Sequence, residues 1–175
     1  GGLYIRKGLN ISPIVFGGNQ ELGLRSGTEN VQGIIGFGQA VKILAENFER
    51  ESSQVKKVRE YMVERIREEI DHIRINTPLD GDSSPYILNV SFLNTRGEVL
   101  LHYLEDRDIY VSTGSACSSR GTDKSHVLLA LGLSDEVIDG AIRISFSYEI
   151  SIEDIDYVIK AIKESVEEIR EIMMR

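Results

Sequence analysis

The chain has 175 residues, which is enough for one ordinary domain or two small ones with a real apolar core. Its hydrophobic content of 41% and charged content of 27% are typical of a soluble globular protein, and its net charge of -8 argues against a nucleic-acid-binding surface. It shows no signal-peptide pattern and no apolar run long enough to cross a membrane, and its single cysteine excludes an internal disulfide. We therefore expect a cytoplasmic protein without nucleic-acid or membrane partners.

The start of the chain predicts extended structure. Residues 3–8 are typical of a strand that ends at a turn, and residues 10–16 of a second extended run, in which Pro13 disfavours a helix. The first residue is glycine rather than methionine, and a strand is already under way, so we expect the sequence to be a piece of a longer chain. A polar, glycine-rich loop follows over residues 17–28.

Two helices are expected next. Ser26 and Glu29 have the spacing of a capping box, which predicts a helix from there to about Ala45. This helix contains three glycines, which cost helix stability and predict a close approach to its backbone: Gly33, Gly36 and Gly38. A second helix, over residues 47–71, has apolar residues at steps of three and four and a charged opposite face. It could connect two parts of the protein.

The remaining sequence alternates predicted strands and helices. We expect strands at residues 73–76, 86–92, 108–111 and 141–147. We expect helices at residues 96–105, 124–131 and 134–138, and a final helix that Ser151 caps. Asp123 is the expected cap of the helix at residues 124–131. This alternation predicts a small α/β domain in which helices pack on a sheet. The domain division we predict is residues 1–46, a connecting helix over 47–72, and an α/β domain over 73–175.

Cys117 is the first candidate for chemistry. It lies in a run of small, hydroxylated and glycine residues, 112–121, which favours an accessible loop. Thiolate is the reactive form of cysteine, and Arg120 and Lys124 are close enough in sequence to supply positive potential. The alternative is an exposed thiol without a function.

Arg143 is the second candidate. It stands between Ile142 and Ile144 in a strand with strict alternation, so its side chain is expected on the opposite face from theirs. The planar fork of a guanidinium suits a carboxylate, which it holds with two parallel hydrogen bonds. A structural salt bridge with an Asp or Glu is the alternative.

Thr28, with Arg25 nearby, is the third candidate. A helix N-terminus that follows glycines and carries a hydroxyl and a cation can bind phosphate, although an ordinary cap has the same pattern. The three histidines, His72, His102 and His126, are scattered, so we expect no metal site built from the protein alone.

Three stretches together resemble one family. Residues 17–31 resemble the G-G-x-Q-E-x-G-x-R-S-G-T-x-N-V signature of cysteine desulfurases. Residues 112–117 resemble their S-x-G-S-A-C loop, and residues 142–145 resemble their I-R-x-S strand. The order and spacing fit as well, and the resemblance covers essentially the whole chain.

The resemblance implies the C-terminal part of a pyridoxal-phosphate (PLP) fold type I enzyme that works as a homodimer. Such enzymes convert L-cysteine to L-alanine and keep the sulfur as a persulfide for scaffold proteins of iron-sulfur clusters or other sulfur acceptors. The resemblance makes Cys117 the nucleophile and a possible transient iron-sulfur ligand. It makes Arg143 the residue that binds the substrate carboxylate, and Thr28 the contact to the cofactor phosphate of the other subunit.

Two departures from the family pattern stand out. Ser147 and Tyr148 occupy positions where many members have Gly-Arg. The cofactor lysine should precede Gly1, and Lys7 cannot take its role because it follows the first strand. We therefore expect the chain to be inactive alone. The alternatives are a selenocysteine lyase, or an interaction or redox-sensing module with an exposed reactive thiol.

Overall fold

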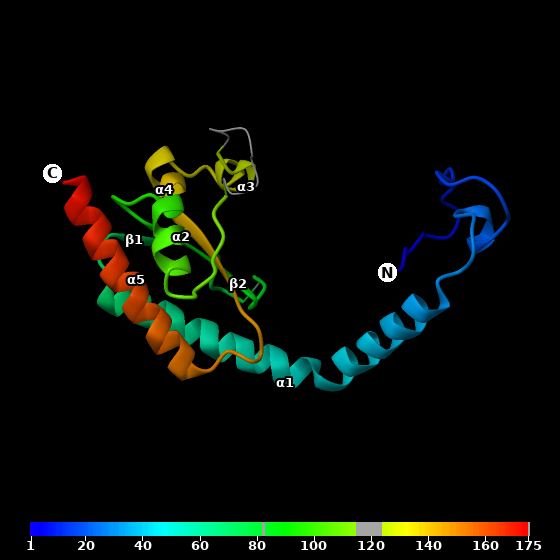
Figure 1. The fold of residues 1–175 in the computed structure, drawn as a ribbon, viewed down its shortest axis with the longest axis horizontal. Helices are drawn as coiled ribbons and strands as arrows, with labels where there is room; N and C mark the ends of the chain where they lie inside the picture. The colour runs from blue at the N-terminus through cyan, green and yellow to red at the C-terminus, as the bar shows by residue number, and fades with distance from the viewer. Residues whose placement is uncertain (82, 115–123, 175) are drawn as a thin grey trace. The chain divides into compact units, whose positions relative to one another are not determined.

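The computed structural model describes residues 1–81, 83–114 and 124–174. They fall into two compact units, Gly1–Phe48 and Glu49–Arg175, whose elements are labelled in Figure 1. Cys117 and Arg120 lie outside the described residues.

The first unit is irregular up to its helix. It contains a short 3-10 helix, η1 (Glu21–Gly23), and one parallel backbone bridge between Val15 and Arg25. Residues 3–8, all of them described, form no strand, so that prediction was wrong. An extended segment becomes a strand only where a neighbour completes its hydrogen-bond ladder, and residues 1–48 supply no neighbour for it.

Helix α1 (Val31–Glu69) is one continuous helix of 39 residues, where the sequence predicted two. It contains no proline, and the polar residue at the expected break stays within the helix, because Asn47 Nδ2 donates to the Ile43 carbonyl at 2.8 Å. Among the described residues, nothing makes the predicted close approach to Gly36 or Gly38. Apart from the backbone of the helix itself and the adjacent residues, no described atom lies within 4 Å of a Cβ built at either position.

Asn30 caps the start of α1 in place of the predicted capping box. Asn30 Oδ1 accepts a hydrogen bond from the Gly33 N–H at 3.0 Å. Ser26 Oγ instead donates to the Gly18 carbonyl at 2.6 Å, inside the preceding loop. The box was wrong because the helix begins at Val31, too far along the chain for Ser26 to reach its first N–H groups.

The second unit contains an antiparallel three-stranded sheet in the order β1 (Ile73–Ile75), β2 (Ile87–Phe92), β3 (Ala141–Ser145). Three of the four predicted strands are thereby confirmed. Residues 108–111, all described, form no strand, and Ser112 makes an isolated bridge to β3 instead.

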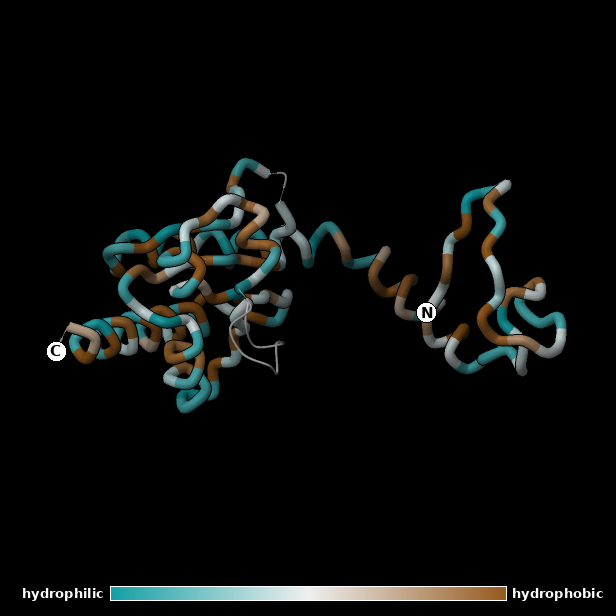
Figure 2. The backbone as a smooth tube through the Cα atoms, turned by 90° about the horizontal axis from the view of Figure 1, so that it is seen from above, coloured by the Kyte–Doolittle hydropathy of each residue, from teal (hydrophilic) through white to brown (hydrophobic). Residues whose placement is uncertain are grey.

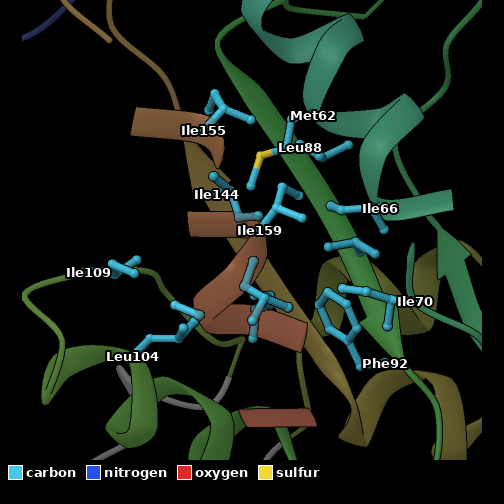
Figure 3. Close-up of a cluster of buried hydrophobic side chains, with 14 of the residues drawn as sticks. Met62, Ile66, Ile70, Leu88, Phe92, Leu104, Ile109, Ile144, Ile155 and Ile159 are labelled. Carbon is cyan, nitrogen blue, oxygen red and sulfur yellow. The ribbon is translucent and has the colours of Figure 1, made fainter. Parts of the chain in front are cut away.

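The larger apolar cluster of this unit lies on one face of the sheet, where α1, α2 (Gly97–Glu105) and α5 (Ile152–Met173) pack. Figure 3 shows Met62 and Ile66 of α1 and Ile159 of α5 converging on Leu88 and Phe92 of β2. In Figure 2, apolar residues recur among polar ones along α5, as expected for a helix with one buried face.

Two short helices, α3 (His126–Ala130) and α4 (Asp135–Asp139), precede β3. Ser125 caps α3 by accepting from the Leu128 N–H, whereas the predicted cap, Asp123, lies outside the described residues. The capping box of Ser151 and Asp154 at the start of α5 is confirmed. No described helix combines the length and the apolarity needed to cross a membrane.

Candidate functional site

Arg143 lies in the middle of β3, on the face of the sheet opposite α1, α2 and α5. Ile142 and Ile144 are buried in the core, at 0% and 7% exposure, while Arg143 is exposed, which confirms the predicted alternation. Among the described residues, no carboxylate forms an ion pair with its guanidinium. The salt bridge considered for Arg143 is therefore not found in the described part of the chain.

Ser112 is held against Arg143 by three hydrogen bonds. The Ser112 N–H donates to the Arg143 carbonyl at 3.0 Å, and the Arg143 N–H donates to the Ser112 carbonyl at 2.6 Å. Arg143 Nη2 also donates to Ser112 Oγ at 3.3 Å. The bridge ties the first residue of the S-x-G-S-A-C stretch to the candidate carboxylate-binding residue.

Two asparagines that were not predicted from the sequence share the face of Arg143. Asn89 of β2 is the register partner of Arg143, and Asn76, just beyond β1, donates from Nδ2 to Asn89 Oδ1 at 2.7 Å. The signal in the sequence was a polar residue between the buried Leu88 and Val90, which places Asn89 on the outer face. Its neighbour on the next strand could not be read from local sequence.

Lys124 does not present a free charge. Its Nζ lies 2.7 Å from Asp135 Oδ1, so a carboxylate balances the cation proposed to assist the thiol. A cavity of about 440 Å³ lies beside this pair. Thr113, Gly114 and Ser125 line it together with the start of α2, so it adjoins both ends of the segment that contains Cys117.

Thr28 belongs to the first unit, where it is exposed three residues before α1. Arg25 Nη1 donates to the carbonyls of Gly27 and Thr28 at 3.1 and 2.8 Å. Gly27 has a φ of 103°, a conformation that favours glycine. The turn thus brings the Arg25 guanidinium to the backbone of the exposed Thr28 near a helix N-terminus, and a cation and a hydroxyl in such a turn are donors that fit a phosphate group.

Comparison with known proteins supports the resemblance. Residues 1–158 match the family model "Aminotransferase class-V". A cysteine desulfurase IscS of Clostridium botulinum is 38% identical over 172 residues, which are 98% of this chain and 43% of that protein. A cysteine desulfurase IscS of Methanosarcina thermophila is also 38% identical, over 97% of this chain and 42% of that protein. The chain thus spans less than half the length of these curated relatives.

Solved structures agree with this comparison. A NifS-like protein superposes with a TM-score of 0.80 at 40% identity, over 94% of this chain and 41% of that one. A NifS-like protein from Rickettsia africae has a TM-score of 0.76 at 29% identity, over 91% of this chain and 41% of that one. These matches confirm the predicted α/β fold as part of a NifS-like PLP enzyme fold. The chain belongs to the class-V aminotransferase family and resembles its IscS-like and NifS-like members.

Proposed function

We propose that the complete protein is a PLP-dependent cysteine desulfurase that converts L-cysteine to L-alanine and retains the sulfur on Cys117. The observation that carries this proposal is the bridge between Arg143 and Ser112. It joins an exposed guanidinium that has no carboxylate partner among the described residues to the segment that leads to the thiol.

Arg143 would bind the carboxylate of L-cysteine. The neighbours of Arg143 on β3, Ile142 and Ile144, are buried in the core and hold the strand in place. The guanidinium on the other face is exposed and accessible to a ligand. Two parallel hydrogen bonds from a guanidinium fix the plane of a carboxylate, and they orient the rest of a small amino acid.

Cys117 would act as the nucleophile. It follows Ser112 by five positions, and a span of chain of that length reaches at most about 18 Å. The thiolate sulfur forms an S–S bond with the sulfur of the bound cysteine, and the Cβ–S bond of the substrate breaks. The electron pair of that bond stays on the substrate carbon, which takes up a proton and becomes the methyl group of alanine. The products are L-alanine and a persulfide on Cys117.

Enzymes of this class depend on PLP. When bound, PLP supplies the electron sink that allows bonds at Cα and Cβ of an amino acid to break. Thr28 would hold its phosphate from the partner subunit of a homodimer. In this assignment residues 1–46 belong to the large cofactor-binding domain, residues 47–72 form the connecting helix, and residues 73–175 form the small domain. The cofactor lysine is expected upstream of Gly1.

The persulfide would pass to an acceptor protein, such as a scaffold for iron-sulfur clusters, in the cytoplasm. The names of the relatives support this assignment, since several are IscS proteins.

The test uses the protein extended upstream through the cofactor lysine. Cys117→Ser should abolish persulfide formation, while the yellow absorption band of bound PLP remains. Sulfur transfer by the variant would contradict the assignment of Cys117. A wild-type protein that binds no PLP, but whose thiol still reacts, would support the redox-sensing alternative. A wild-type protein that processes selenocysteine but not cysteine would support the selenocysteine lyase.

A further inference from the structure

We propose that Asn89 is a second binding residue for the substrate carboxylate, donating from its side-chain amide beside the guanidinium of Arg143. The inference rests on the proposed function, because it assumes that Arg143 binds a carboxylate. Asn89 lies outside the three family motifs at residues 17–31, 112–117 and 142–145.

The sheet places four polar residues in one row on its outer face. Asn89 of β2 pairs with Arg143 of β3, and Arg143 makes the isolated bridge to Ser112. Asn76, just beyond β1, lies on the other side of Asn89. The Asn76 N–H donates to the Asn89 carbonyl at 2.9 Å, which continues the row beyond β1. Directly opposed side chains on one face of a sheet have Cβ atoms roughly 4.5–5.5 Å apart. Asn89 is therefore an immediate neighbour of Arg143.

The side-chain oxygen of Asn89 is already engaged. Asn76 Nδ2 donates to Asn89 Oδ1 and to Ser91 Oγ, both at 2.7 Å. Ser91 is fully buried, and the Asn89 N–H donates to Thr77 Oγ1 at 2.7 Å. With these bonds Asn89 Oδ1 faces Asn76, whose own Oδ1 is buried and accepts no hydrogen bond from a described residue. No described residue accepts a hydrogen bond from Asn89 Nδ2.

Two neighbouring donor groups then share one face. A guanidinium has five N–H donors and no acceptor, and an amide nitrogen is likewise a donor, so Arg143 and Asn89 Nδ2 cannot satisfy each other. An anion with several acceptor sites can satisfy both. A carboxylate has two oxygens with about four lone-pair sites, of which a bidentate guanidinium uses two. The remaining sites can accept from Asn89, and this contact selects for ligands that carry the carboxylate.

The test compares two ligands on the PLP-loaded protein extended upstream through the cofactor lysine. L-Cysteine carries the carboxylate, whereas cysteamine has the same thiol and amine without it. Asn89→Ala should raise the KM for L-cysteine roughly tenfold, as expected for one hydrogen bond to a charged group, and leave the inhibition constant of cysteamine unchanged. Asn10→Ala, the same change at an exposed site of the first unit, serves as the control and should alter neither constant.

Asn89→Asp separates a donor from an acceptor. The variant keeps the shape of the side chain and the bond from Asn76, but it places a negative charge beside Arg143 that competes with the substrate. We expect a larger rise in KM than for Asn89→Ala. If the KM of Asn89→Asp for L-cysteine is closer to the wild-type KM than that of Asn89→Ala, Asn89 serves as an acceptor that holds the guanidinium, and the proposal is overturned. Equal weakening of both ligands by Asn89→Ala would reveal a merely structural role and would overturn it as well.

Arg143→Ala distinguishes a failure of this proposal from a failure of the proposed function. An unchanged KM for L-cysteine in Arg143→Ala would reject carboxylate binding by Arg143 and, with it, the role of Asn89. A large rise in the KM of Arg143→Ala, together with an unchanged KM in both Asn89 variants, would support Arg143 as the carboxylate-binding residue and reject Asn89 alone.

Discussion

Ser112 and Arg143 exchange two backbone hydrogen bonds, and the guanidinium of Arg143 donates a third to the hydroxyl of Ser112. The bridge is isolated, because residues 108–111 do not continue it as a strand. One residue pair, Ser112 and Arg143, therefore fixes where the chain leaves the sheet. This point lies beside the proposed carboxylate site.

Replacing Ser112 tests this bridge. Ser112→Pro removes the N–H that donates to the Arg143 carbonyl, whereas Ser112→Ala keeps both backbone bonds and loses only the hydroxyl. In the complete enzyme we expect Ser112→Pro to lower kcat for L-cysteine by roughly tenfold or more, because small displacements of reacting groups are costly, and Ser112→Ala to change it less than about threefold. Equal turnover of L-cysteine by the two variants would show that the bridge does not position the segment.

Gly140 is required by close packing between α4 and β2. A Cβ at this position would lie 2.3 Å from the carbonyl oxygen of Phe92, and the backbone on both sides is fixed, since the Phe92 N–H donates to the Gly140 carbonyl at 2.9 Å. We expect Gly140→Ala to lower the free energy of unfolding by about 2–3 kcal/mol, measured by urea denaturation. Gly36→Ala is the control. Nothing described lies near its Cβ, so this helical position should lose no stability.

The second unit should fold without the first. The buried apolar side chains of the described chain all lie between Val55 and Ile169, whereas most large apolar residues of Gly1–Phe48 are exposed. We therefore expect a protein of residues 49–175 to unfold cooperatively in guanidinium chloride and to show dispersed amide signals in NMR spectra. A broad transition with collapsed amide signals would mean that the core depends on residues 1–48.

Arg170 holds the end of α1 and the end of β2 together. Its guanidinium donates to the carbonyls of Asp71, His72 and Leu93 at distances between 2.9 and 3.1 Å. Arg170→Met removes the donor of the Asp71 and Leu93 carbonyls, whereas the His72 carbonyl still accepts from the Leu93 N–H at 2.9 Å. We expect a loss of about 1–3 kcal/mol in the free energy of unfolding. Arg67→Met is the matched control, because the exposed Arg67 makes no such bonds among the described residues. A similar loss of unfolding free energy in both variants would mean that the lost positive charge, rather than these hydrogen bonds, causes the effect.

Asp156 gives the protein a dependence on acid pH. The hydroxyl of Tyr61 donates to its carboxylate at 2.7 Å, and this bond, followed by Arg65, lowers the pKa of Asp156 below its ordinary value of 3.8. A carboxyl with a lowered folded pKa adds stability above its unfolded pKa and loses that stability as the pH falls through the folded value. We expect Tyr61→Phe to reduce the difference between the melting temperatures at pH 6 and pH 3. If the two melting temperatures differ by as much in Tyr61→Phe as in the wild type, the hydrogen bond between Tyr61 and Asp156 does not contribute to stability in solution.

Local sequence was sufficient for much of the second unit. The alternation of Ile142, Arg143 and Ile144 predicted which side of β3 faces the core, and the spacing of Ser151 and Asp154 predicted the cap of α5. These features depend on residues close together in the chain, where the strand period and the first turn of a helix fix the geometry. The order of the three family motifs is likewise a property of the sequence alone.

Only the tertiary structure decided which outer-face residues become neighbours of Arg143. Asn89 and Ser112 reach it through strand register and an isolated bridge, and their pairing depends on how the whole apolar set of β2, β3 and the helices packs. The continuity of α1 through Asn47 was likewise settled by the folded chain, because a weak helix former does not end a helix whose flanking turns are stable. Periodicity along the chain selects the face of each residue, and packing across the chain selects its neighbours.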